Sequence, residues 1–342
     1  MAGGSSRQDG APPPRRRVAA YVDLDLVGDA LIKLPFVRAL RHAWPEAELI
    51  WIAGRGRSAY AGALAPLMPG LLDRVIEQSG VGAGLRAAVG APRLDVLIDT
   101  QSHVGTTLAL RRLWPRRFVS AAAGYWLSGV RPPWGYRKPR RLIRRLLDLA
   151  AFAAGHPAEP AGAVALPPAT LAQAAALLPS GPIYVAQVIG AGGRHKAWPL
   201  DRHVALAEAL AQAGRVPVLI LGPAEQDLVA PLRDRLPMAR FPLQAAGGVA
   251  GVDLTIALGA RCAAAVAGDC GGGHMMAASG VKLVSLFGPT DPAKFAPWTG
   301  HLTLLRAQDF GGVEMGAIPV PAVLASVAEA ILSSRSAEGR NR

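Results

Sequence analysis

Cysteine is almost absent from this chain. Only Cys262 and Cys270 occur among 342 residues, they do not form a CxxC pair, and the seven histidines are scattered. A disulfide framework requires more cysteines, and a structural zinc site requires clustered ligands. The sequence therefore supports neither, and a reducing cytoplasm is the expected compartment.

Long uninterrupted apolar runs are also missing. Although the mean hydropathy is +0.26, charge, Gly or Pro breaks every apolar stretch well short of the ~18 residues of a membrane span. The stretch after Arg15–Arg17 carries Asp23, Asp25 and Asp29, which a secretory signal would not tolerate. We therefore predict no transmembrane helix, and we interpret residues 1–17 as a disordered tail.

Charged residues are few, at 18% of the chain, whereas apolar residues make up 51%. This balance excludes a largely disordered protein and is typical of buried parallel sheets flanked by helices. A single core seldom grows beyond about 250–300 residues, so 342 residues favour two α/β domains of about 150 residues each.

Strand and helix patterns alternate along the chain. A strand over 18–27 precedes a helix over 28–42, and further helices are expected over 58–67 and in the basic region 131–154. A second alternating series follows a segment rich in Pro, Gly and Ala, so both sheets should be parallel. The predicted divisions are the tail 1–17, a first Rossmann-like domain 18–165, a linker 166–182, a second Rossmann-like domain 183–318 and a C-terminal helix 319–334.

The net charge of +13 predicts acidic partners. Basic residues gather over 111–117 and 131–145, which suits a phosphorylated glycan, anionic lipid headgroups or nucleic acid; a merely solvated basic face is the alternative. Tryptophans at 114, 126 and 134 lie nearby, yet no nucleic-acid-binding motif accompanies them. We therefore expect no nucleic-acid partner.

Residues 269–274, Asp-Cys-Gly-Gly-Gly-His, follow an apolar strand and contain three consecutive glycines. Glycine lets a phosphate approach the backbone, and the free N–H groups and dipole of a helix N-terminus attract anions. A plain turn capped by Asp is the alternative. The candidate anion-binding residues here are Asp269, Gly271, Gly272, Gly273 and His274.

A second glycine-rich segment, residues 188–199, contains Gly190 and ends in Arg194, His195 and Lys196. A diphosphate leaving group gains negative charge as its bond to a sugar breaks, and a positioned cation stabilises that charge. Lys196 is the candidate for this role. The alternative is an ordinary surface lysine.

A carboxylate, Asp29, follows Gly28 at the start of the first expected helix, and Lys33 lies one turn later on the same face. Asp29 could accept a proton from a hydroxyl substrate. An Asp in a first turn is also stabilised by the helix dipole, whatever the function.

Four ordered motifs make the chain resemble glycosyltransferase family 9, the ADP-heptose:lipopolysaccharide heptosyltransferases. They are Val-Gly-Asp-Ala-Leu-Ile-Lys-Leu-Pro from 27, Trp-Pro-Glu-Ala-Glu from 44, His-Lys-Ala-Trp-Pro from 195, and Asp-Cys-Gly-Gly-Gly-His from 269 leading to Leu-Phe-Gly-Pro-Thr-Asp-Pro at 286–292.

The resemblance implies an α/β GT-B fold, with the acceptor on the first domain, the donor on the second and a final helix that returns to the first domain. It implies that Asp29 is the catalytic base, that Lys196 binds the donor phosphate and that Glu225 contacts the ribose. The implied donor contacts are Gly190, Arg194, Lys196, Glu225, Asp269, Gly271, Gly272, Gly273 and His274, and the candidate acceptor contacts are Lys33, Arg55, Arg57, Arg140, Arg141 and Arg144.

The expected activity is inverting, metal-independent transfer of a heptose or related sugar from a nucleoside diphosphate, ADP-heptose first, to a lipopolysaccharide-type glycolipid. No cofactor or metal is expected, and we expect a monomer that contacts the anionic cytoplasmic face of the inner membrane. Two departures from the family pattern stand out: Cys270 replaces a hydroxyl residue, and Asp23-Leu-Asp25 resembles a metal-binding Asp-x-Asp signature. A sugar-nucleotide epimerase and a non-catalytic nucleotide-sugar-binding protein are the alternatives.

Overall fold

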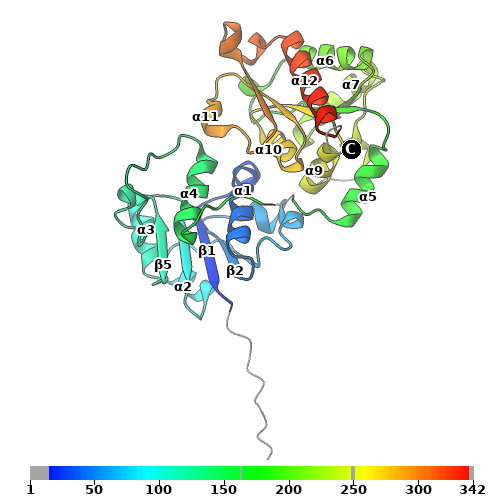
Figure 1. Ribbon diagram of the computed structural model, residues 1–342. Helices are drawn as coiled ribbons and strands as arrows, with labels where there is room; N and C mark the ends of the chain where they lie inside the picture. The colour runs from blue at the N-terminus through cyan, green and yellow to red at the C-terminus, as the bar shows by residue number, and fades with distance from the viewer. Residues whose placement is uncertain (1–14, 162–163, 248–250, 339–342) are drawn as a thin grey trace, which may run out of the picture.

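Two parallel five-stranded sheets form the two halves of the molecule (Figure 1). The computed structural model describes residues 15–161, 164–247 and 251–338. The first sheet has the order β3-β2-β1-β4-β5. Its strands are β1 (Arg17–Val22), β2 (Glu48–Ala53), β3 (Arg74–Ile76), β4 (Val96–Asp99) and β5 (Arg117–Ser120). The helices of this half are α1 (Val27–Ala43), α2 (Ala83–Val89), α3 (Val104–Arg111) and α4 (Leu142–Ala154), with 3-10 turns η1 (Ala59–Ala61), η2 (Ala65–Leu67) and η3 (Ala122–Tyr125).

The second sheet has the order β10-β9-β8-β6-β7. Its strands are β6 (Tyr184–Val188), β7 (Val216–Ile220), β8 (Ala264–Gly268), β9 (Leu283–Phe287) and β10 (Leu302–Arg306). The helices are α5 (Pro168–Leu177), α6 (Leu200–Gln212), α7 (Val229–Arg235), α8 (Pro242–Ala245), α9 (Val252–Ala260), α10 (Gly271–Ser279), α11 (Pro292–Phe295) and α12 (Val320–Glu338). The 3-10 turns are η4 (Arg194–Lys196), η5 (Pro223–Leu228), η6 (Ala307–Phe310) and η7 (Met315–Ala317).

The central strands are apolar on both faces because helices cover both sides of each sheet. All six residues of β1 and all five of β6 are buried, as expected for strands inside a parallel sheet. The predicted α/β class with parallel sheets is confirmed.

The two halves share an apolar contact. Val252 and Ile256 of α9 belong to the same buried cluster as the core side of α1 and α4, and α1 packs against α10. The ends of several strands therefore face the junction between the halves, which is where ligands bind in open α/β sheets.

Four expectations about elements are wrong. β1 begins at Arg17, whose buried guanidinium pairs with Glu48, so residue 17 is not tail; residues 1–14 of that predicted tail lie outside the described part of the chain. β1 also ends at Val22, well before residue 27. Residues 58–67 form two 3-10 turns because Gly62 and Pro66 interrupt a helix. Prolines at 132, 133 and 139 confine the helix of the basic region to α4.

The C-terminal helix does not return to the first domain. Val323, Val327 and Ile331 of α12 pack into a cluster with α6 and strands β8 and β9 of the second half. Figure 1 accordingly shows α12 beside α6, away from the first sheet. Its apolar stripe fits the second sheet, whose outer face it covers.

Within the described residues, the structure contains no helix with the length and apolar character needed to cross a membrane.

Candidate functional site

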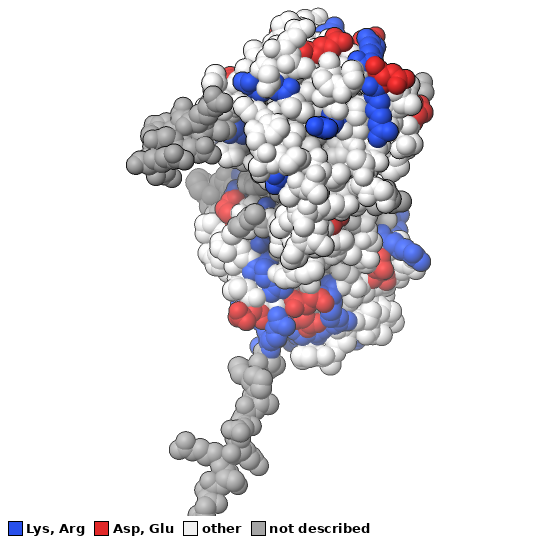
Figure 2. Space-filling view, turned by 90° about the vertical axis from the view of Figure 1, so that its right-hand side faces the viewer, with Lys and Arg blue, Asp and Glu red and all other residues white. Residues whose placement is uncertain are grey.

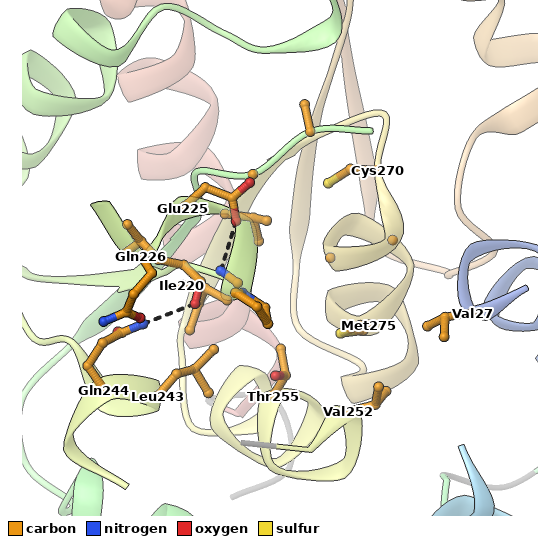
Figure 3. A pocket seen from close by; sticks show the side chains of 18 of the residues that line it. Val27, Ile220, Glu225, Gln226, Leu243, Gln244, Val252, Thr255, Cys270 and Met275 are labelled. Carbon is orange, nitrogen blue, oxygen red and sulfur yellow. Dashed lines mark hydrogen bonds between the residues drawn. The ribbon is translucent and has the colours of Figure 1, made fainter. Parts of the chain in front are cut away.

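A cavity of about 810 Å³ lies between the two halves (Figure 3). The first half contributes Val27, at the start of α1, and Ala63. The second half contributes the ends of β6 and β7, the segments that follow β6, β7 and β8, and the helices α7, α8, α9 and α10. The volume is in the range of sites that hold a whole small-molecule ligand. Figure 3 shows Cys270 and Met275 on the α10 side and Val252 and Thr255 on α9.

Glycines form one wall of this cavity. Gly190, Gly271 and Gly272 line it, and the last two open α10, so the unpaired N–H groups of a nine-residue helix lie at the wall. A Cβ at Gly272 would lie 2.5 Å from Cγ1 of Val188, whereas at Gly271 the nearest atom would be 3.9 Å away. Gly272 is therefore required for helix α10 to approach β6, while Gly271 leaves space for a ligand.

Cys270 caps this helix in an extended conformation and also lines the cavity. Burial raises the pKa of its thiol, although the amides of Gly273 and Gly272 oppose the rise. The thiol is therefore a neutral, weakly polar group beside the helix N-terminus.

Glu225 holds its carboxylate over the opposite wall. Its Oε2 accepts a hydrogen bond from the Gly222 amide at 3.0 Å, and a Cβ at Gly190 would lie 2.8 Å from its Oε1. Figure 3 shows Glu225 between the loops after β6 and β7. A fixed carboxylate in this place can accept hydrogen bonds from vicinal hydroxyls such as those of a ribose.

Several cavity residues were not expected from the sequence. Gln244 donates from Nε2 to the Leu221 carbonyl at 3.1 Å, and Gln226, Arg233, Leu243 and Thr255 also line the cavity. These are single residues on η5, α7, α8 and α9 and belong to no motif. The sequence offers one signal for them: Pro242 after an apolar residue indicates the start of a helix, and this helix, α8, contains Leu243 and Gln244.

Lys196 and Asp269, expected from two separate motifs, form an ion pair. Nζ of Lys196 lies 2.9 Å from Oδ2 of Asp269, and both side chains are partly buried. Lys196 ends η4, and Asp269 directly follows β8. Neither residue lines the cavity wall itself; the pair lies beside it, one residue before Cys270. Arg194 begins η4, and its side chain lies outside the described part of the structure.

Asp29 is exposed in the first turn of α1, two residues after the cavity residue Val27. Leu31 of the same helix reaches to within 3.9 Å of the position that a Cβ at Gly271 would take. The structure thus brings the start of α1 and the start of α10 together, although they are about 240 residues apart in sequence.

Lys33 is buried rather than extended into solvent. Burial lowers its pKa, while the nearby charges of Asp29 and Asp25 raise it. The charges of both carboxylates thus act on the Lys33 ammonium, and the interpretation of Lys33 as an acceptor contact stays a prediction.

Asp23 and Asp25 do not converge. Asp23 forms an ion pair with Arg55, whereas Asp25 is fully buried and accepts hydrogen bonds from Trp51 Nε1 at 2.9 Å and Ser58 Oγ at 2.8 Å. Burial raises the pKa of Asp25. In the described part of the chain no three His, Cys, Asp or Glu residues cluster as a metal site would require.

His274 does not line the large cavity. It faces a smaller cavity between α1, α4 and α10, with Arg38, Lys294 and Trp298 around it. Burial lowers its pKa to about 4, so the ring is neutral near pH 7. Gly273 does not line the large cavity either, and a Cβ there would lie 3.0 Å from the Gly268 carbonyl oxygen.

The remaining basic candidates lie on the first half. Arg55 and Arg57 are exposed after β2, and Arg144 pairs with Asp148 and Glu159 within that half. Arg140 and Arg141 instead reach across the junction: Arg140 pairs with Asp291 at 3.1 Å, and Arg141 donates to the carbonyls of Ala296, at 3.0 Å, and Pro297.

The family model of glycosyltransferase family 9 (heptosyltransferase) matches residues 85–313, which include both cavity-forming glycine segments. The chain belongs to glycosyltransferase family 9. A curated relative of this family 9 chain, lipooligosaccharide heptosyltransferase 2 of Haemophilus influenzae, is 30% identical over 116 residues, or 33% of this chain and 33% of the relative. That match thus spans about a third of the relative's length.

Solved structures share the fold of this family 9 chain. A glycosyltransferase family 9 protein from Veillonella parvula superposes with a TM-score of 0.71 at 18% identity, covering 93% of this chain and 97% of that one. ADP-heptose LPS heptosyltransferase II of E. coli gives 0.68 at 20% identity, with 93% and 99% covered. E. coli heptosyltransferase WaaC with ADP gives 0.67 at 20% identity, with 92% and 99% covered. These similarities confirm the predicted GT-B fold of two Rossmann-like units.

Proposed function

We propose that this protein transfers a heptose, or a closely related sugar, from a nucleoside diphosphate to a lipopolysaccharide-type glycolipid. The observation that carries the proposal is the cavity between the halves, which joins a fixed carboxylate, Glu225, to a glycine-rich helix N-terminus at Gly271. A ribose and a diphosphate are the two polar parts of a nucleotide that such an arrangement suits. ADP-heptose is the proposed donor because two E. coli relatives are named for it or were solved with ADP.

The transfer uses groups from both halves. Asp29 removes the proton of an acceptor hydroxyl, whose oxygen attacks the anomeric carbon of the sugar. The bond from that carbon to the diphosphate oxygen breaks, and the diphosphate leaves with the electron pair. Attack from the side opposite the leaving group inverts the anomeric centre, because acceptor and donor approach from different halves.

The developing charge on the diphosphate requires positive potential. Lys196, already beside the cavity in its pair with Asp269, and the free amides at the start of α10 supply it. Asp23 and Asp25 are engaged by Arg55, Trp51 and Ser58. These placements support metal-independent transfer.

The test is an incubation with ADP-heptose and a lipopolysaccharide acceptor truncated before its first core heptose. We expect release of ADP and a gain of one heptose by the acceptor, each dependent on both substrates. Turnover of the donor without acceptor would identify an epimerase or hydrolase instead. If the protein binds ADP but forms no ADP from ADP-heptose with any acceptor, it is a non-catalytic binding protein.

A further inference from the structure

The positive charge of this protein is concentrated in one acid-free stretch of the first half. Residues 100–147 contain eleven Lys and Arg and neither Asp nor Glu, against an excess of 13 in the whole chain. Such a concentration attracts an extended anionic surface more strongly than the same charges spread evenly would.

The exposed tryptophans lie in the same stretch. Of seven tryptophans, Trp114, Trp126 and Trp134 are largely exposed, and all three fall within residues 100–147. Trp126 is 73% exposed and Trp134 fully so. A tryptophan in water forgoes the burial of a large apolar ring, whereas at a membrane interface its ring and its N–H are both accommodated.

Part of this stretch lies along the edge strand β5, and the part around Trp134 and Arg137 returns to it, because the rings of Tyr136 and Tyr125 pack edge to face with centroids 6.0 Å apart. Gly129 donates its amide to the Phe118 carbonyl at 2.8 Å, so the chain after Trp126 runs beside the strand, and Arg111 at the end of α3 donates to the Leu127 carbonyl at 3.0 Å. The Arg131 guanidinium lies 4.8 Å from the ring centroid of Trp126. Figure 1 places α3 and β5 at the outer side of the first half. We call Trp126, Arg131, Trp134, Arg137 and Lys138 the β5-edge surface.

The cations of the β5-edge surface have no acidic partners. Within the described residues, Arg131, Arg137 and Lys138 form no ion pair, unlike Arg41 and Arg74 at the β3 edge, which pair with Asp73 and Glu48. Figure 2, viewed from the side opposite α3 and β5, shows Lys and Arg interspersed with Asp and Glu over the first half. At the β5 edge Arg116 also pairs with Asp95. In the described part of the chain, the unpaired cations of this edge therefore include those of the loop after β5, Arg131, Arg137 and Lys138.

We propose that the β5-edge surface docks the protein on a membrane containing anionic phospholipid. The free cations lie among the headgroups, and Trp126 and Trp134 enter the interface. Arg140, at the end of the same loop, pairs with Asp291 of the second half, so the docked face borders the junction between the halves. A glycolipid in that membrane could reach the junction without leaving the bilayer. Docking itself does not rest on the proposed transfer reaction.

The test is flotation of the full chain with phosphatidylcholine vesicles containing about one third phosphatidylglycerol, without donor or acceptor. We expect binding at ~0.1 M NaCl, little binding to pure phosphatidylcholine, and release at ~1 M NaCl, where the Debye length falls to about 3 Å. The variant Arg131→Gln/Arg137→Gln/Lys138→Gln should bind at least about tenfold more weakly, because it removes three positive charges that the anionic headgroups attract.

The matched control is Arg215→Gln/Arg235→Gln/Arg306→Gln, which removes the same charge from the second half and should bind like wild type. Trp126→Ser/Trp134→Ser should also bind the vesicles more weakly. A higher fraction of phosphatidylglycerol should not fully restore its binding, because the lost contribution is apolar rather than electrostatic. Unchanged thermal unfolding shows that each variant folds. Equal loss in the control, or no flotation of wild type with anionic vesicles, would overturn the proposal; so would tight binding of a 30-nucleotide RNA at this surface without vesicle binding.

Discussion

Nζ of Lys196 lies 2.9 Å from Oδ2 of Asp269, which joins two motifs 73 residues apart beside the cavity between the two halves. The ion pair holds the Lys196 side chain in one position, and it places the Asp269 carboxylate next to the proposed diphosphate site. A diphosphate arriving at this place competes with Asp269 for the same ammonium, so the pair must loosen or share its charge when donor binds.

Lys196→Ala should weaken binding of ADP and slow turnover together. The charge that Lys196 neutralises is present in the donor and grows in the transition state, and the truncation also leaves Asp269 unpaired near the phosphates. Isothermal titration with ADP and steady-state rates measure the two effects. Lys196→Ala/Asp269→Asn should recover part of the affinity but little of the rate; unchanged ADP binding in Lys196→Ala would remove this lysine from the site.

Gly272→Ala should lower stability, whereas Gly271→Ala should not. The added methyl at 272 would lie 2.5 Å from Cγ1 of Val188, and such overpacking costs about 1–3 kcal/mol. At 271 the nearest atom is 3.9 Å away. Urea unfolding of both variants makes the comparison. Equal stability of the two would mean that α10 and β6 do not meet as described.

Arg141→Gln should lower the free energy of unfolding by about 1–3 kcal/mol, because its guanidinium serves carbonyls of Ala296 and Pro297 that would be left unsatisfied. It also lies 5.0 Å from the centroid of the Trp298 ring. The control is Arg140→Gln, whose exposed pair with Asp291 should contribute less than about 1 kcal/mol. If both variants lose the same stability, the contact across the junction is not specific to Arg141.

Transfer should survive excess EDTA and gain little from Mg²⁺ or Mn²⁺. Lys196 and the start of α10 provide the positive potential, and Asp23 and Asp25 are held apart by different partners. The rate of ADP release with and without chelator measures this. Abolition by EDTA with recovery on added metal would mean that the Asp-x-Asp segment serves a divalent ion.

Much of the fold could be predicted because its signals are local. The start of α1, the glycine loops at strand ends and the alternation of strand and helix follow from residue patterns. The packing partners of the helices could not be predicted from the sequence. The apolar stripe of Val323, Val327 and Ile331 on α12 could pack on any apolar surface, and only the structure shows that it covers the second sheet. No strand was predicted at β5 or β10, which are the edge strands of their sheets. β5 begins with an exposed arginine and no residue of β10 is buried, so neither shows the fully buried apolar run of a central parallel strand.

The candidate site was predictable where a motif carries the chemistry. Gly190, Glu225, Gly271 and Gly272 all line the cavity. His274 faces away because helix α10 begins at Gly271, which turns the fourth residue toward α1 and α4. The basic residues Arg140 and Arg141 were expected to meet an acceptor, and charge alone could not indicate that they also bridge the two halves.

Asp29 is the proposed general base of the transfer between the two halves. Its role is tested by the rate of heptose transfer from saturating ADP-heptose by Asp29→Asn, with ADP affinity determined on the same sample. We expect unchanged ADP affinity and a rate lower by roughly 100-fold or more, because a general base would be lost. A rate close to that of wild type would show that Asp29 is not the base.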